Sequence, residues 1–308
     1  MCAMSPRFGI HAGLQNTSVA ELQAIWQQAD TSGFDWVSVW DHFYAASTFD
    51  GTPGSYENHE AVAMHAALAC STSNVRCGCL VYSAGYRHPG VLAKAIATID
   101  HLSGGRAEIG LGGGWSQAEY DAYGFPFPSA GERLDLLEES AACVRSLLRN
   151  EVTNFSGKHF QFTDAWLQPR PLQAELPIWI GGGGERRTLR IVARHADGWN
   201  VPFIPPEEFA RKRSVLAAHC EAEGRDPATI RCAINVGICA DEESLQAQFG
   251  ALAQFVRPGV LVGRGQELVD RIGEYVDAGA DQVNFALRAP WDPGLLDLAT
   301  EAVEAYRG

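Results

Sequence analysis

The chain has 308 residues, of which 46% are hydrophobic and 20% are charged, so it can bury a large core and long disordered regions are not expected. Its 24 lysine and arginine residues against 37 aspartate and glutamate residues give a formal net charge of −13, which argues against a nucleic-acid-binding protein and against a polybasic membrane anchor. No apolar run reaches the ~20 residues that span a bilayer, and the first residues form no apolar signal segment, so we expect a soluble, cytoplasmic protein.

From the N-terminus, short apolar segments alternate with segments of helical periodicity. The first strand is predicted at 8–12, and the helix predicted at 19–32 places Leu22, Ile25 and Trp26 on one face. The alternation continues with a strand at 36–40, a helix at 60–71, a strand at 75–82, a helix at 91–102, a strand at 107–111 and a helix at 132–149. A β-hairpin that turns at Ser156 and Gly157 is predicted next.

The second half of the chain repeats the alternation. Strands are predicted at 177–180, 198–201, 231–239 and 282–286, and helices at 188–195, 206–224, 242–255, 267–278 and 295–306. Eight strands that alternate with helices indicate parallel βαβ units, and this number in a chain of 308 residues fits a closed barrel. We therefore predict an α/β fold, a (β/α)8 TIM barrel that forms a single domain over residues 1–308, with an insertion at about 115–176 between strands four and five.

An open, doubly wound sheet is the competing architecture, and the glycine-rich segments argue against it. The dinucleotide fingerprint GxGxxG needs a third glycine, but the run that starts at Gly110 has Trp115 in that place, and the run that starts at Gly181 has Arg186. Both runs also lie in the middle of the chain rather than after the first strand.

The eight cysteines are expected to be reduced. Most lie within apolar segments, and Cys77 and Cys79 are separated by one residue rather than by the two residues of a CxxC redox or zinc motif. Such thiols are expected to act as small buried apolar groups.

Polar residues follow most of the predicted strands. In a barrel the carboxyl ends of the strands meet at one face, where active sites form. The candidates at these ends are His11, Asp41, His42, Ser83, Tyr86, Arg87, His88, Asn200 and Arg288. His42 is the candidate for proton transfer, because imidazole titrates near neutral pH, although helix capping or packing is its alternative role. A metal site formed by His11, Asp41 and His42 is not expected, because the His-x-His pattern of barrel metallohydrolases is missing after the first strand.

Four consecutive glycines, Gly181–Gly184, directly precede the helix predicted at 188–195. Their backbone can approach a ligand closely, and their amide groups lie at the positive end of the helix dipole, which suits a phosphate. A tight turn without a ligand is the alternative. Four tryptophans, at positions 36, 40, 115 and 199, lie near strand ends, and their indoles suit a flat aromatic cofactor, although ordinary packing also accounts for individual ones.

Several segments, taken in order, resemble the luciferase-like monooxygenase superfamily and, within it, the coenzyme F420-dependent oxidoreductases. The segments are 33–43, 86–100, 103–115, 123–133 and 177–200, and they include the sequences WVSVWDHF, RAEIGLGGGW and PIWIGGGGERRTL. They cover most of residues 8–200, whereas the C-terminal third matches only in general pattern.

The resemblance implies a TIM barrel that binds F420, or alternatively FMN, at the carboxyl ends of its strands. His42 is similar to the histidine beside the deazaflavin ring, and Gly182, Gly183, Gly184 and Glu185 are similar to the family's phosphate-binding turn. The other cofactor contacts are expected from Asp41, Cys79, Leu80, Ser83, Gly112 and Trp115. The resemblance also implies a homodimer, and a non-proline cis peptide in the third strand that by position falls at Cys79–Leu80.

We thus expect an F420-dependent oxidoreductase that transfers a hydride between F420 and a small organic substrate, with His42 moving the coupled proton. Trp115 stands where the F420-dependent sugar-phosphate dehydrogenases have a glutamate, which favours an apolar or aromatic substrate. The alternatives are an FMN-dependent monooxygenase that uses reduced flavin and O₂, and a non-catalytic flavin-binding relative. Substrate selection is expected to depend on residues 47–59, on residues 115–128 and on the hairpin near His159.

Overall fold

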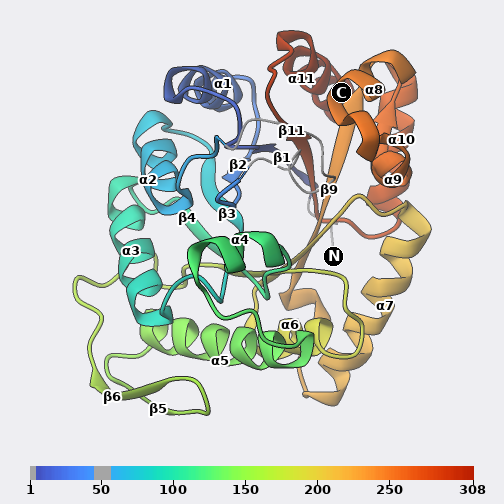
Figure 1. Cartoon of the computed structure of the whole chain (residues 1–308). Helices are drawn as coiled ribbons and strands as arrows, with labels where there is room; N and C mark the ends of the chain where they lie inside the picture. Colours follow the sequence, from blue (N-terminus) through green and yellow to red (C-terminus); the bar gives the residue numbers. More distant parts are fainter. Residues whose placement is uncertain (1–4, 45–56) are drawn as a thin grey trace.

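Eight parallel strands form a closed barrel in the computed structural model, which describes residues 5–44 and 57–308 (Figure 1). In order around the barrel these strands are β1 (Arg7–Ala12), β2 (Trp36–Val39), β3 (Arg76–Ser83), β4 (Ala107–Gly112), β7 (Ile178–Gly181), β8 (Gly198–Pro202), β9 (Arg231–Cys239) and β11 (Gln282–Leu287). The pairings of β9 with β8 and with β11, and of β11 with β1, close the ring. The predicted TIM barrel is confirmed. Cys2 and residues 47–56 of the predicted substrate-selecting segment lie outside the described residues.

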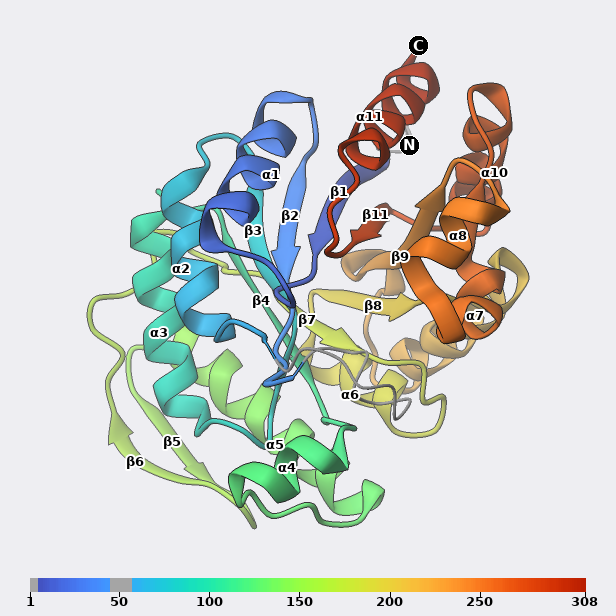
Figure 2. The ribbon, with the colours of Figure 1, turned by 45° about the horizontal axis from the view of Figure 1, so that its top comes forward.

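Helices surround the barrel, as the two views in Figure 1 and Figure 2 show. They are α1 (Val19–Thr31), α2 (Ala61–Ser71), α3 (Pro89–Leu102), α5 (Ala130–Arg149), α6 (Thr188–His195), α7 (Pro206–Ala222), α10 (Gln266–Asp277) and α11 (Pro293–Arg307). Their apolar faces pack on the outside of the strands and form the larger part of the core. Within the described ranges, no helix is both long enough and apolar enough to cross a membrane.

The helix predicted at 242–255 is wrong in its second half. α8 (Glu242–Phe249) ends at Gly250, whose φ of 51° is left-handed and cannot continue a helix, and α9 (Ala253–Val256) follows after a short 3₁₀ turn. The sequence analysis also missed α4 (Gln117–Tyr123) and β10 (Val260–Val262), which pairs with the end of β9. Elements this short contain too few residues to show a clear periodicity.

The interior of the barrel is filled from the amino ends of the strands. The indoles of Trp36 and Trp179 lie there with their ring centroids 5.6 Å apart. Next to them the buried carboxylate of Glu108 accepts a hydrogen bond from the Trp179 indole at 2.5 Å and forms ion pairs with Arg7 and Arg76. This packing leaves the carboxyl ends of the strands as the side of the barrel at which a ligand can enter.

The segment between β4 and β7 divides into two parts. α4 follows β4 and lies over the carboxyl ends of the strands (Figure 1), whereas the hairpin of β5 (Thr153–Ser156) and β6 (Gln161–Ala165) lies outside the ring of helices. There the His88 ring packs against Phe160 and Phe162, and the Glu139 carboxylate on α5 accepts hydrogen bonds from three amides of the turn. The hairpin itself was predicted correctly, but it does not line the cavity described below.

The pairing between β3 and β4 slips once. Regular pairing ends at Cys79 and resumes at Tyr82, and over this step β3 carries one residue more than β4, which makes a β-bulge. The peptide bond between Leu80 and Val81, inside the bulge, is cis. The predicted position, Cys79–Leu80, is therefore wrong by one residue, because Cys79 is still paired with β4 and only the residues after it leave the ladder.

The side chain of Val81 fills space that glycines leave on β4 and β7, the next two strands around the barrel. A Cβ atom on Gly112 would lie 2.4 Å from Val81 Cγ2, and one on Gly181 would lie 2.8 Å from Val81 Cγ1. A Cβ atom on Gly110 would meet the Cys79 carbonyl oxygen at 2.3 Å. Glycine at these three positions is therefore what allows the bulge to lie against β4 and β7.

We expect Gly112→Ala to lower the free energy of unfolding by about 1–3 kcal/mol, because its methyl group would overlap the stiff, β-branched side chain of Val81. Urea denaturation of the wild type and the variant measures this difference. The double variant Val81→Ala/Gly112→Ala removes the overlap and should recover part of the loss. If Gly112→Ala alone were as stable as the wild type, the close contact of Val81 with β4 would not constrain the bulge.

Candidate active site

A cavity of about 470 Å³ lies at the carboxyl ends of the barrel strands. Seven of the predicted site residues line it, namely Asp41, His42, Leu80, Ser83, Gly112, Trp115 and Gly182. His11, Asn200 and Arg288, which the sequence analysis also placed at strand ends, line it as well. The barrel thus brings the candidates from seven strands to one site, as expected for this fold.

Four predicted cofactor contacts do not line this cavity. Cys79 is fully buried in β3, where burial raises the pKa of its thiol well above the usual value and keeps it neutral. Gly183, Gly184 and Glu185 continue from Gly182, which lines the cavity, into the loop between β7 and α6. These three residues are therefore neighbours of the cavity rather than part of its wall.

The amide groups of the glycine loop are not equivalent. The Gly182 amide donates a hydrogen bond to the carbonyl oxygen of Asn200 at 2.9 Å, so it is already engaged within the protein. The hydrogen bonds found among the described residues do not use the amides of Gly183 and Gly184. These two amides precede the first turn of α6, where an anion is favoured by the helix dipole.

Basic side chains of α7 hold the far side of this loop. Lys212 Nζ donates to the carbonyl oxygen of Gly183 at 3.0 Å and to the carboxylate of Glu185 at 3.1 Å, and Arg211 pairs with the same carboxylate at 2.8 Å. The hydrogen bonds from Arg211 and Lys212 lower the pKa of Glu185 to about 2. Glu185 is therefore ionised and engaged by cations, which places it in the support of the loop.

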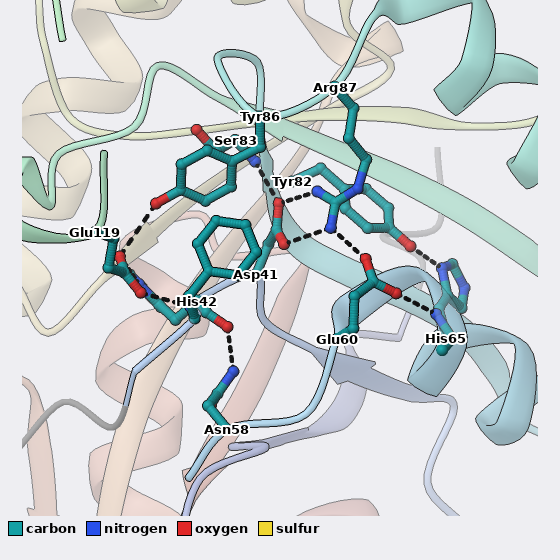
Figure 3. Close-up of polar contacts among 12 residues, drawn as sticks. Asp41, His42, Asn58, Glu60, His65, Tyr82, Ser83, Tyr86, Arg87 and Glu119 are labelled. Atoms are coloured by element: carbon teal, nitrogen blue, oxygen red, sulfur yellow. Dashed lines mark hydrogen bonds and ion pairs between the residues drawn. The ribbon is translucent and has the colours of Figure 1, made fainter. Parts of the chain in front are cut away.

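His42 is held by a carboxylate that the sequence analysis did not consider. Its Nδ1 lies 2.9 Å from Oε2 of Glu119, a residue of α4 that is 0% exposed (Figure 3). Oε1 of Glu119 accepts hydrogen bonds from the amides of Phe43 and Tyr44, at 2.5 and 3.1 Å, and Oε2 accepts one from the Tyr86 hydroxyl at 3.1 Å. Glu119 thus joins α4, the end of β2 and the end of β3.

The Glu119 carboxylate is ionised. Burial acts to raise its pKa, but the hydrogen bond and charge of His42 and the two backbone amides outweigh burial, so that the pKa of Glu119 lies below its ordinary value. An ionised acceptor at Nδ1 favours the form of His42 that carries a proton on this nitrogen. The imidazole is therefore fixed in both orientation and tautomer.

Asp41 is paired on the opposite side of the same strand end. Its carboxylate accepts two hydrogen bonds from Arg87, at 2.6 and 3.0 Å, and a third from the Ser83 amide at 3.0 Å (Figure 3). Arg87 also pairs with Glu60. Burial raises the pKa of Asp41, while the Arg87 guanidinium counteracts this shift. Asp41 lines the cavity, but these contacts make it an anchor for the end of β3.

Two buried histidines near the site are neutral. His11 Nδ1 lies 2.9 Å from the Ser38 hydroxyl, and His65 Nδ1 lies 2.9 Å from the Tyr82 hydroxyl. Burial lowers the pKa of each to about 4, and for His11 the charges of His42 and Arg288 add to the effect. At neutral pH both histidines are therefore neutral imidazoles, and neither can act as an imidazolium acid.

Two of the four tryptophans considered in the sequence line the cavity. They are Trp40 and Trp115, whose rings lie 5.6 and 5.4 Å from the His42 ring between centroids. Trp36 lies deep inside the barrel, and Trp199 stacks on Phe209 of α7. The prediction that all four indoles surround the cofactor is therefore wrong for Trp36 and Trp199. The direction in which a strand side chain points depends on its place in the alternation of the strand, and nearness to a strand end does not reveal it.

Glu119 is the most informative residue that sequence reasoning missed. It follows Trp115 by four residues and brings a carboxylate to the site from α4, beyond the strand end that Trp115 occupies. The available signal was an acidic residue in a short segment that ends at Gly124, a left-handed helix cap. Within residues 5–44 and 57–308, no group of three or more histidine, cysteine, aspartate or glutamate side chains is placed to hold a metal ion.

We expect Glu119→Ala to lower the free energy of unfolding by about 1–3 kcal/mol, because the half-buried backbone of Phe43 and Tyr44 would lose the acceptor of its two amides. Urea denaturation measures the loss. Asp121→Asn, an exposed change on the same helix, serves as the control and should stay within about 0.5 kcal/mol of the wild type. A Glu119→Ala protein as stable as the wild type would mean that these contacts do not stabilise the backbone of Phe43 and Tyr44.

His65 should make stability depend on pH below neutrality. Because its pKa falls from 6.5 unfolded to about 4 folded, its contribution is complete above pH 6.5 and is lost as the pH falls toward 4. His65→Asn, which retains a polar atom near the position of Nδ1, should remove up to about 3 kcal/mol of this pH-dependent loss. Urea denaturation at several pH values tests this, with the exposed His101→Asn as a control that should keep the wild-type slope. Identical slopes for His65→Asn and the wild type would contradict the expectation.

Comparison with known proteins was made at the level of both sequence and structure. A model of the luciferase-like monooxygenase family matches residues 3–259. The chain is 30% identical over 244 residues to the F420-dependent glucose-6-phosphate dehydrogenase of Kineococcus radiotolerans. The aligned region covers 78% of this chain and 70% of that protein. It is 26% identical over 244 residues to the FMNH2-dependent dimethylsulfone monooxygenase of Pseudomonas putida. That aligned region covers 79% of this chain and 64% of that protein.

A solved structure shares the whole fold. The F420-dependent secondary alcohol dehydrogenase in complex with an F420–acetone adduct superposes with a TM-score of 0.87, over 99% of this chain and 100% of that chain, at 19% sequence identity. Identity at this level shows a common fold, while the family match over most of the chain shows common membership. The chain therefore belongs to the luciferase-like monooxygenase family and is an oxidoreductase.

Proposed function

We propose that this protein is an F420-dependent oxidoreductase that transfers a hydride between coenzyme F420 and a small organic substrate. The observation that carries the proposal is a single cavity in which His42, held by the buried Glu119, is combined with glycine-rich backbone at the ends of β4 and β7. The F420-dependent relative with 30% identity supports F420 as the cofactor.

The residues of the cavity suit a flat ring with an anionic tail. A Cβ atom on Gly113 would meet no protein atom closer than 3.7 Å, so glycine at this lining position leaves room for a ligand rather than for another side chain. Trp40 and Trp115 supply apolar ring surfaces. The amides of Gly183 and Gly184, in the loop between β7 and α6, are donors of the kind that a phosphate group needs.

Bound F420 would supply the hydride chemistry, and the protein would supply position and proton transfer. Since Glu119 engages Nδ1 of His42, we assign the proton that accompanies hydride transfer to Nε2 of the same ring. The Glu119 carboxylate also stabilises the ring while it holds that proton. Asp41 takes no part in this step, because Arg87 and the Ser83 amide occupy its carboxylate.

The lining favours a substrate with an apolar or aromatic body. Leu134 and Phe203 line the cavity together with Trp40 and Trp115. Such surfaces bind apolar groups by removing them from water and orient aromatic groups by stacking. This lining supports the substrate class expected from Trp115.

An FMN-dependent monooxygenase is the second candidate, and the FMNH2-dependent relative with 26% identity favours it. Both cofactors combine a flat ring with a phosphate, so the same cavity suits either. Oxygen consumption with FMNH2 supplied by a separate reductase separates the two functions. Rapid consumption that needs a substrate would support the monooxygenase, and F420 reduction without oxygen would support the proposal.

Titration of the protein with F420, followed by quenching of the F420 fluorescence, tests the cofactor directly. We expect saturable binding at micromolar protein, and no binding there would overturn the proposal. His42→Ala should bind F420 nearly as well as the wild type, because the other contacts remain.

Turnover of the same His42→Ala variant should fall by about 100-fold to 10,000-fold, the usual cost of losing a positioned acid or base. The assay is F420 absorbance in a screen of secondary alcohols, and F420H2 absorbance in a screen of unsaturated carbonyl compounds. His101→Asn is the control. His101 lies in the last turn of α3, away from the cavity, so this variant should keep wild-type turnover. Full activity in His42→Ala would instead remove His42 from the reaction.

A further inference from the structure

Arg288 is a cation in the cavity for which residues 5–44 and 57–308 provide no paired carboxylate. It directly follows β11 and is the one lysine or arginine among the described residues that line the cavity. In the part of the chain that the structure describes, its guanidinium forms neither an ion pair nor a hydrogen bond, and lies over the Phe249 ring at 4.4 Å from the ring centroid. Arg87, which lies near the same cavity, is by contrast paired with the carboxylates of Asp41 and Glu60.

The two titratable groups that interact with Arg288, Cys239 and His11, are uncharged at neutral pH. Burial raises the pKa of the Cys239 thiol to about 12 and lowers the pKa of the His11 imidazole to about 4. Burial also lowers the pKa of Arg288 itself to about 10, so that the guanidinium keeps its proton near pH 7. The result is a positive charge in a partly desolvated place, beside a neutral thiol, a neutral imidazole and an aromatic ring.

A charge in such a place opposes folding. Removing an ion from water costs free energy, and only a partner of opposite charge offsets that cost. The cation–π contact with Phe249 offsets a part of it. An apolar residue at position 288 would therefore be compatible with the fold, and the arginine is accounted for if an anion from outside the chain completes the pair.

The position of Arg288 separates it from the proposed cofactor contacts. β11 lies three strands around the barrel from β3, whose bulge carries Leu80 and Val81, and three strands in the other direction from β7, which leads into the glycine loop. Between these regions the cavity is lined by apolar groups such as Trp40 and Phe203. An anion bound at Arg288 therefore belongs to a molecule that shares the cavity with the cofactor ring.

We propose that Arg288 binds the carboxylate of the substrate, which is then a small carboxylic acid with an apolar or aromatic body. The proposal rests on the proposed function, in that the cavity is the substrate site. One guanidinium matches the single charge of a carboxylate and binds it with two parallel hydrogen bonds, whereas a phosphate monoester carries a charge nearer to −2. The apolar lining receives the rest of the molecule.

Calorimetric titration with trans-cinnamate and with its neutral analogue cinnamamide tests the proposal, on the protein alone and on the protein saturated with F420. We expect the wild type to bind cinnamate at least about tenfold more tightly than cinnamamide, the usual effect of a hydrogen bond to a charged group. Arg288→Gln should lose this preference, and Arg288→Lys should retain part of it. Arg264→Gln, an exposed arginine outside the cavity, is the matched control and should behave as the wild type.

Two further measurements keep the outcomes distinct. The melting temperature of Arg288→Gln should equal or exceed that of the wild type, since the variant no longer buries an unpaired charge, so a loss of cinnamate binding cannot be attributed to unfolding. Phenyl phosphate should bind more weakly than cinnamate, and tighter binding of phenyl phosphate would overturn the assignment to a carboxylate.

The F420 titration separates the two proposals. If Arg288→Gln weakens F420 binding as much as cinnamate binding, Arg288 serves the cofactor and the further proposal fails. If the wild type binds F420 but shows no preference for cinnamate over cinnamamide, the further proposal fails while the proposed function stands. If the wild type binds cinnamate through Arg288 but does not bind F420, the proposed function fails and the anion site remains.

Discussion

The slip in pairing between β3 and β4 is the constraint on which the shape of the site depends. One additional residue in β3 turns Val81 toward the two strands that follow around the barrel, and those strands carry glycine where a Cβ atom would collide with it. The glycine-rich segments that start at Gly110 and Gly181 therefore have two structural roles. Gly110, Gly112 and Gly181 make room for the bulge, whereas the glycines after them expose backbone toward the cavity and the start of α6.

A second regularity is the pairing of buried charges. Glu119 is paired with His42, Asp41 with Arg87, and Glu108 with arginines at the amino ends of the strands. These pairs join segments that are distant in sequence, and each lets a charged group be buried because a partner offsets the loss of water. Arg288 departs from this pattern, and the departure is located in the cavity where a ligand can supply the missing charge.

The proposed chemistry follows from how these two features meet. The bulge and the glycines give the cavity a wall of backbone, and the Glu119–His42 pair places an oriented imidazole in the same cavity. α4 makes this possible, because the helix carries the carboxylate over the carboxyl ends of the strands (Figure 1). A hydride-transferring cofactor needs the protein for position, proton transfer and exclusion of other reactions, and these residues are arranged to provide the first two.

The order of the eight barrel strands and of the longer helices was determined by the sequence alone, because apolar periodicity is a local property and survives in every barrel strand. The candidates at strand ends, His42 among them, followed from that order, since parallel strands deliver their carboxyl ends to one face. Only the tertiary structure decided that Glu119 is the partner of His42, that the hairpin near His159 lies away from the cavity, and that Trp40 and Trp115 rather than Trp36 and Trp199 line it. These facts depend on contacts between distant residues and on the direction of each side chain in the barrel, which local patterns do not contain.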